Sequence, residues 1–384
     1  MKKITLLILL IITGANAQDY SRMYSVSNSL STELTDYQIL VELDTQALIS
    51  EGKMQVDCDD VRFIPALGSA TQLSYWLESG CNTTLTRVWV KVLSIPAGGT
   101  DIYMTYGDNS ATSESDGEAT FMFFDDFTSA SLDTSKWNVN TNATIDNTMG
   151  DTDMSSVKMN LTGTNANGLQ SNLLPDNNFA IHSTYYDHGF GGASTNTWSG
   201  VFGADVYSGV ESGALPNYSY YTAGYGNTGV ARSIGWHYSE VYFSNNQSKT
   251  IVDRGAFESP LVANNGIPGD MIFYSWNVQS NFDTIFVRNY EAELIVTEGE
   301  TLSNIDFDYA KKNVLVYPNP TTTEFSIKNA LHSKVTIYNT LGKRMVDVVS
   351  YDGNAIDVSD FNSGLYYVNI NSEKVNSTRK IMIK

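Results

Sequence analysis

The C-terminal stretch VLVYPNPTTTEFSI, Val314 to Ile327, places β-forming side chains before and after two prolines. Val, Ile, Tyr and Phe are enriched in strands. Pro318 and Pro320 cannot donate a backbone hydrogen bond, so we expect them at the margin of a strand. The stretch therefore predicts that the chain ends in a small β-domain.

The residues after this stretch continue the pattern. The run VTIYNTLGKRM (Val335 to Met345) ends in a predicted hairpin turn with Gly342 at a position that needs positive φ. The run IDVSDFNSGLYYVNI (Ile356 to Ile370) alternates apolar and polar residues after Gly364. Residues 313–384 also hold 8 Lys and Arg against 6 Asp and Glu, whereas the whole chain has a net charge of −19. This contrast marks the tail as a separate unit.

These motifs resemble the type A sorting domain of the Bacteroidetes type IX secretion system. The residues that carry the resemblance are Tyr317, Pro318, Asn319, Pro320, Gly342, Gly364, Tyr366, Lys380 and Lys384. Phe361 stands where the family usually has Leu, which keeps an apolar side chain. The resemblance implies a small β-sandwich that the type IX translocon recognises and that is then removed. The alternative is an ordinary C-terminal sandwich that takes part in binding.

The other end of the chain has the features of an export signal. Lys2 and Lys3 precede the apolar run Ile4 to Ile12, and Ala15-Asn16-Ala17 follows. We expect cleavage between Ala17 and Gln18. The run is shorter than the ~20 residues that cross a bilayer, and no other apolar run approaches that length. We therefore expect no transmembrane segment and a protein that is secreted or displayed on the outer-membrane surface.

The composition favours an all-β protein. The chain has 23 Tyr and 29 Gly, only 17% charged residues, and short β-rich runs between Asn, Gly, Asp and Ser clusters. Nucleic acid is not an expected partner, because binding it depends on Lys and Arg to neutralise phosphates.

The two cysteines, Cys58 and Cys81, favour a disulfide, because an even count in an exported chain is typical of one. In the chain-entropy model such a bridge contributes ~3 kcal/mol. Two buried free thiols and a metal pair are the alternatives. The metal pair is disfavoured because zinc ligands are closely spaced and the chain has only 4 His.

Strand-like runs fill the region from Asp36 to Phe127. Within them, Trp89 and Tyr103 are expected to face the core, because alternate positions around them are apolar. The series D-V-R-F, Y-W-L-E, V-W-V-K-V, I-P and Y-G-D resembles the DUF2341 family. That resemblance implies a small β-sandwich of surface proteins with no established activity. We expect its polar members, Arg62 and Glu78, to form a structural ion pair rather than a binding site.

The next region resembles a concanavalin A-like (laminin G-like) jelly roll. The run FMFFDDF, Phe121 to Phe127, resembles its opening strand, and Asp283 to Tyr290 its closing strand. The length between them, about 175 residues, suits two packed sheets. The expected order is a signal peptide (1–17), a DUF2341-like sandwich (18–120), a jelly roll (121–298), a linker (299–312) and the sorting domain (313–384).

Glycoside hydrolases of this fold need two carboxylates, about 5–5.5 Å apart in retaining enzymes. Glu291 and Glu293 have a same-face spacing but lie at the exit of the region, and Asp125 and Asp126 are adjacent, so they face opposite sides. No E-x-D-x-x-E, G-x-S-x-G, H-E-x-x-H or phosphate-loop motif occurs. The sequence favours a protein that is not an enzyme, with a polysaccharide-degrading enzyme as the alternative.

Aromatic side chains interleaved with Gly, Asn and Ser crowd the segment from Tyr185 to Phe243. Flat rings match the C–H faces of sugars, and polar side chains match their hydroxyl groups. The candidates for ligand binding are Trp198, Tyr225, Arg232 and Trp236. A jelly roll also buries aromatic residues between its sheets, so the core is the favoured location for any single ring. The expected role is carbohydrate binding or adhesion to a polysaccharide or surface glycan. A purely structural surface protein is the third hypothesis.

Two acidic clusters could supply oxygen ligands to Ca²⁺, the only cofactor that the sequence indicates. They are Asp57, Asp59 and Asp60, and Asp146, Asp151 and Asp153. Neither has the spacing of an EF-hand. Solvated loop carboxylates are the favoured interpretation, and no cofactor is required.

Overall fold

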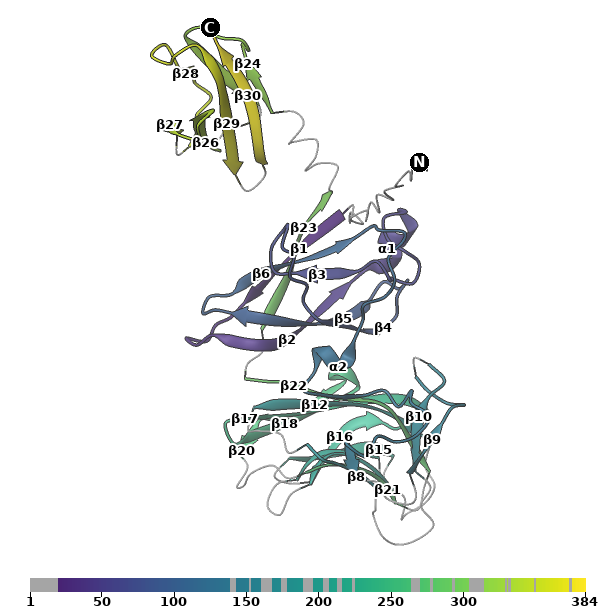
Figure 1. The fold of residues 1–384 in the computed structure, drawn as a ribbon. Coiled ribbons are helices and arrows are strands. Elements are labelled where there is room, and N and C mark those ends of the chain that lie inside the picture. Colours follow the sequence, from purple (N-terminus) through teal and green to yellow (C-terminus); the bar gives the residue numbers. More distant parts are fainter. Residues whose placement is uncertain are drawn as a thin grey trace, which may run out of the picture. The chain divides into compact units, whose positions relative to one another are not determined.

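The computed structural model describes most of the chain from Tyr20 onward (Figure 1). The described residues are 20–138, 143–151, 153–159, 168–173, 178–188, 196–202, 207–212, 216–222, 225–263, 270–276, 279–291, 294–303, 314–328, 330, 333–348, 350–372 and 375–384. The expected signal peptide with its Ala17–Gln18 cleavage site, and most of the expected linker, lie outside these residues. None of the helices that the structure describes is long and apolar enough to cross a membrane.

The middle of the chain forms two stacked antiparallel sheets (Figure 1). Among the described residues, the first sheet has the order β19 (Phe257–Glu258), β18 (Gln247–Val252), β17 (Gly235–Ser244), β12 (Phe179–Asp187), β22 (Ser280–Asn289), β10 (Ser156–Met159), β9 (Ala143–Asp146). Two short strands join it, with β20 (Val262–Ala263) beside β18 and β7 (Phe123–Asp125) beside β22. The second has the order β16 (Tyr225–Ala231), β15 (Asn217–Thr222), β14 (Tyr207–Ser212), β13 (Asn196–Phe202), β21 (Asp270–Trp276), β11 (Leu169–Ser171), β8 (Trp137–Asn138). These two sheets confirm the expected jelly roll.

Two smaller sheets form the N-terminal sandwich. One has the order β23 (Ile295–Ser303), β1 (Tyr20–Ser27), β6 (Thr100–Tyr106), β3 (Arg62–Ile64), and the other β2 (Leu34–Leu43), β5 (Thr86–Ile95), β4 (Tyr75–Ser79). Short helices α1 (Thr45–Ser50) and α2 (Gly117–Thr120) complete it. Strand β23 occupies the first part of the predicted linker, so these residues are sheet rather than connector. A disulfide joins Cys58 to Cys81.

Strand β22 is buried along nearly its whole length because both of its faces are covered. Phe282 and Val287 pack into the core between the two jelly-roll sheets. Phe286 points the other way and packs on Trp89 of the sandwich and on Phe121, which directly follows α2, with a ring-centroid distance of 4.2 Å to Phe121. Residues 24–103 and 112–298 therefore form one compact unit, in which the sandwich lies on the outer face of a jelly-roll sheet (Figure 1).

Two predictions about the sandwich need adjustment. Trp89 is buried as expected, but among aromatic residues shared with the jelly roll. The prediction for Tyr103 is wrong, because Ile102 and Met104 take the buried positions of β6 and leave Tyr103 on the half-buried face.

The C-terminal part is a small sandwich with its own core. Its sheets have the orders β24 (Leu315–Tyr317), β25 (Glu324–Lys328), β28 (Ile356–Asp357), and β27 (Arg344–Val348), β26 (Lys334–Asn339), β29 (Gly364–Ser372), β30 (Val375–Ile383). Gly342 has a φ of +77°, as its turn requires. Asn319 accepts a hydrogen bond from Met382 N and donates one to Lys380 O, which ties the Y-P-N-P segment to β30.

Candidate functional site

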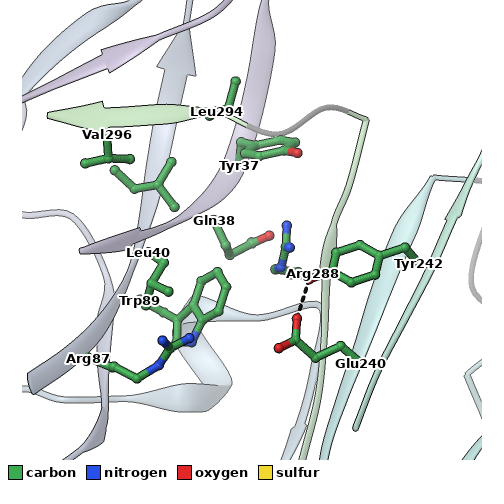
Figure 2. Close-up of a pocket in the computed structure, with 11 residues that line it drawn as sticks. Tyr37, Gln38, Leu40, Arg87, Trp89, Glu240, Tyr242, Arg288, Leu294 and Val296 are labelled. Carbon is green, nitrogen blue, oxygen red and sulfur yellow. Dashed lines mark hydrogen bonds between the residues drawn. The ribbon is translucent and has the colours of Figure 1, made fainter. Parts of the chain in front are cut away.

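A cleft of about 320 Å³ opens where the sandwich lies on the jelly roll (Figure 2). The sandwich side contributes Tyr37, Gln38, Ile39 and Leu40 of β2, Arg87 and Trp89 of β5, Leu294, which directly precedes β23, and Val296 of β23. The jelly-roll side contributes Glu240 and Tyr242 of β17, and Arg288 of β22. We call this hollow the cleft.

The alternation of side chains along a strand explains why these residues meet. In β5, Val88 and Val90 point into the sandwich core, so Arg87 and Trp89 point out of it. Successive residues point to opposite faces of a sheet, so residues two apart on β17, such as Glu240 and Tyr242, share one face. The outer face of each sheet, which carries both aromatic and charged side chains, is thus turned toward the other domain rather than toward water.

The guanidinium group of Arg288 lies among aromatic rings. Its central carbon is 5.1 Å from the ring centre of Trp89 and 5.5 Å from those of Tyr242 and Tyr290. Its Nε donates a hydrogen bond of 3.0 Å to His182 Nε2. Because guanidinium nitrogens only donate, His182 Nε2 must be unprotonated and the imidazole neutral. Burial, and then the positive charge of Arg288, hold the pKa of His182 well below its usual value.

Glu240 is the only acidic residue among the described residues that line the cleft. Its side chain is 13% exposed, and Oε2 accepts a hydrogen bond from the Tyr242 hydroxyl. The same oxygen lies 3.5 Å from His182 Nδ1, which carries the proton of the neutral ring. Burial raises the pKa of Glu240, against the opposing effects of the Tyr242 hydrogen bond and the Arg288 charge.

Glu78 of β4 does not line the cleft but holds two residues that do, Arg87 and Trp89. Its Oε2 accepts hydrogen bonds from Arg87 Nε at 3.0 Å and from Trp89 Nε1 at 2.9 Å. Its Oε1 forms an ion pair of 2.8 Å with Arg254 NH2 of the jelly roll. Arg254 lies in the short turn η1 (Asp253–Gly255), with its guanidinium 3.8 Å from the centre of the Tyr238 ring. Glu78 therefore joins the two domains as well as ordering the wall.

The other polar residue of the DUF2341-like motif, Arg62, has a separate role. Its Nε lies 3.1 Å from Glu114 Oε1, and its other nitrogens donate to the carbonyl oxygens of Asp59, Val61 and Thr112. The predicted ion pair between Arg62 and Glu78 is therefore wrong, because Arg62 pairs with Glu114 whereas Glu78 pairs with Arg87 and Arg254.

The four candidate ligand residues from the sequence occupy other places. Arg232 forms a two-point ion pair with Asp187, whose carboxylate also accepts a hydrogen bond from the Tyr218 hydroxyl. Trp236 packs edge-on against Tyr186 at 5.3 Å. Trp198 is paired along the backbone with Tyr274, and Tyr225 with Tyr221. The side chains of Trp198 and Tyr225 lie outside the described residues, so a site formed by these four residues stays a prediction.

The acidic clusters are engaged in local hydrogen bonds. Asp60 accepts from Gln55 N, and Asp57 from Asp59 N. In the second cluster, Asp146 accepts a hydrogen bond from Thr148, Asp151 accepts one from Tyr238, and Asp153 accepts one from Ser155. Nearby, burial raises the pKa of Asp283 to about 6. Over the part of the chain that the structure describes, no three His, Cys, Asp or Glu side chains form a group that could hold a metal ion.

Two family models match parts of the chain. A domain of unknown function, DUF2341, matches residues 57–140, and the secretion system C-terminal sorting domain matches residues 315–384. The C-terminal part is a type IX sorting domain. The protein that carries this sorting domain is therefore a substrate of the type IX system, secreted or held at the cell surface.

Several solved structures are similar to the chain. One, described with endo-acting O-glycanases of the human gut microbiota, is 12% identical and covers 44% of this chain and 100% of its own, with a TM-score of 0.34. A β-1,3-glucanase from Mycobacterium marinum is 15% identical over 44% and 98% of the two chains, with a TM-score of 0.32. A Bacillus licheniformis β-glucanase is 14% identical over the same shares, with a TM-score of 0.31. No curated protein matches the chain.

Sequence reasoning missed the cleft residues Arg87, Glu240, Tyr242 and Arg288. A signal was present, because Arg87-x-Trp89 and Glu240-x-Tyr242 each place a charged and an aromatic residue on one face of a strand. Nothing in the local pattern shows that the two faces meet.

Proposed function

We propose that this exported protein binds carbohydrate without cleaving it, and that the cleft holds the sugar. The observation that carries the proposal is the meeting of aromatic rings and hydrogen-bonding side chains from two domains at one hollow of about 320 Å³. That volume lies at the small end of the range for ligand pockets, about 300–1,000 Å³, which suits a single sugar unit.

The lining matches the chemistry of a sugar. Sugar rings present apolar C–H faces and a rim of hydroxyl groups, and amphipathic aromatic residues pack well on such surfaces. Trp89 and Tyr242 supply rings, while Arg87 and Arg288 supply donors and Glu240 an acceptor. Because Glu78 and His182 already hold Arg87, Trp89 and Arg288 in position, little side-chain entropy is lost when a ligand binds.

The alternative function is cleavage of a polysaccharide. Both retaining and inverting glycosidases use a pair of carboxyl groups across the scissile bond. The described lining of the cleft has one, Glu240. The geometry therefore supports binding over hydrolysis.

The test uses a variant that fills the cleft without removing a polar contact. Leu40 lines the cleft on β2, so Leu40→Trp should block it and lower glycan affinity by about tenfold or more, equivalent to about 1.4 kcal/mol. The mature protein is first screened on a glycan array, and the best ligand is then titrated by calorimetry. Leu93→Trp, at a 47% exposed position of β5, is the matched control and should bind normally.

The melting temperature of each variant shows whether the fold is intact. Val296→Trp blocks the cleft from the β23 side and provides a second variant. Normal binding by both well-folded blocking variants would refute the cleft as the site. If the parent protein releases reducing sugar and Glu240→Gln does not, the proposed function is hydrolysis rather than binding. Binding to no glycan at all would favour a structural role.

A further inference from the structure

A second hollow lies next to the cleft, on the same outer face of the jelly-roll sheet. It has a volume of about 410 Å³ and is lined by Lys249 and Ile251 of β18, by Arg254, and by Glu258 of β19. Glu240 and Tyr242 line both this hollow and the cleft. We call the second hollow the outer groove. The two spaces therefore adjoin at these shared residues.

The strand register shows how the outer groove runs. Glu240 lies opposite Ile251, and Ile251 lies opposite Glu258. Tyr242 lies opposite Lys249 in the neighbouring row. Opposite residues in an antiparallel sheet share one face, and adjacent strands lie ≈ 4.7–4.9 Å apart. The outer groove therefore runs across the strands from β17 to β19, a distance of about 10 Å.

The cations along the outer groove already have carboxylate partners. Lys249 Nζ lies 2.9 Å from Glu258 Oε1 and 4.8 Å from the centre of the Tyr242 ring. Arg254 is held by Glu78. A polyanion would have to displace these partners, whereas a chain of uncharged hydroxyl groups can bond to the ion pairs as they stand. The surface thus suits a neutral ligand with alternating apolar and hydroxyl-bearing faces.

We propose that the protein recognises the end of a linear, neutral glycan chain. The terminal sugar occupies the cleft, and the following units lie along the outer groove over β17, β18 and β19. This inference rests on the proposed function, and it adds the length, charge and direction of the ligand. Residues of both domains line the cleft, whereas only jelly-roll residues line the outer groove. We therefore assign the terminal sugar to the cleft, which is bordered by both domains, and the following units to the outer groove.

The experiment measures affinity against chain length. The full mature protein is titrated with neutral β-linked gluco-, xylo- and manno-oligosaccharides, from monosaccharide to hexasaccharide. Within the series that binds, we expect affinity to rise by about tenfold or more as the outer groove fills, about 1.4 kcal/mol, and then to level off. Hexasaccharides reduced at one end and labelled at the other identify which end enters the cleft.

The variant Ile251→Arg obstructs the outer groove and leaves the cleft lining unchanged. It should reduce affinity for the longer oligosaccharides to that of the shortest ligand, whose own affinity stays as in the parent. Leu261→Arg, at a 52% exposed position of the jelly roll that lines neither space, is the control. Affinity that is independent of length, or an equal loss at every length in Ile251→Arg, overturns the chain-end inference alone. Binding to no member of any series overturns the proposed function with it.

Discussion

The substitution Glu78→Gln tests whether one carboxylate joins the sandwich to the jelly roll. Glu78 is 11% exposed and accepts from Arg87, Trp89 and Arg254, whereas Glu42, a second carboxylate partner of Arg87, is 44% exposed. Removing one partner of a buried ion pair destabilises a protein by 3–5 kcal/mol, and partial exposure lowers this to about 3 kcal/mol here. An exposed pair contributes 0–1 kcal/mol, so Glu42→Gln should have little effect.

The assay is urea unfolding of the mature protein, followed by tryptophan fluorescence. Trp76 and Trp89 lie in the aromatic cluster between the domains, so their emission reports this interface. Glu78→Gln should move the midpoint to lower urea, and a double-mutant cycle with Arg254→Gln should show a coupling above about 1 kcal/mol. Equal midpoints for Glu78→Gln and Glu42→Gln would refute the role assigned to Glu78.

Three further predictions concern stability. His237 Nδ1 lies 2.9 Å from Asp253 and Nε2 lies 2.9 Å from the Ser233 carbonyl oxygen, so the ring donates twice and is charged. Burial lowers its pKa, but the Asp253 hydrogen bond and charge outweigh this and raise it overall. The stabilisation should therefore be complete below the unfolded pKa of about 6.5 and be lost as pH rises through the higher folded value. Melting temperatures across pH should show this loss in the parent and not in His237→Gln; identical profiles would contradict it. Reducing the Cys58–Cys81 bridge should lower stability by ~3 kcal/mol, seen as an earlier denaturant midpoint with dithiothreitol and no such change in a Cys58→Ser/Cys81→Ser variant. Phe286→Ala should lower stability by about 3–5 kcal/mol in thermal unfolding, because it empties the centre of the aromatic cluster; a change below 1 kcal/mol would mean that this cluster does not hold the domains together.

The tail was readable from the sequence because its signals are local. Each turn residue, such as Gly342, has a conformational reason that its neighbours make visible. The jelly roll was readable from its first and last strands. The cleft could not be predicted from the sequence, because Arg87 and Glu240 are 153 positions apart in the chain. They meet only because the two sheets that carry them pack face to face. A polar residue on the outer face of a strand looks solvated until the covering domain is known.

Two other residues, the ligand candidate Arg232 and the predicted core residue Tyr103, also differ from what the sequence predicts. Arg232 has the chemistry of a sugar-binding residue, but its Nε and NH2 both donate hydrogen bonds to the carboxylate of Asp187 at the end of β12. Tyr103 lies in an alternating run, but Ile102, Met104 and Tyr106 are the residues of that run that face the core, so Tyr103 lies on the opposite face.

The pairing of β23 with β1 means that the N-terminal sandwich is not continuous along the chain. The jelly roll is an insertion within it, and the sandwich sheet is completed only when Ile295–Ser303 has been synthesised. A nascent or truncated chain that stops near residue 120 would leave β1 as an open edge, which is prone to pair with other molecules. The exported chain must therefore emerge as far as β23 before its first domain can close, and fragments for crystallisation or binding studies should extend to residue 303.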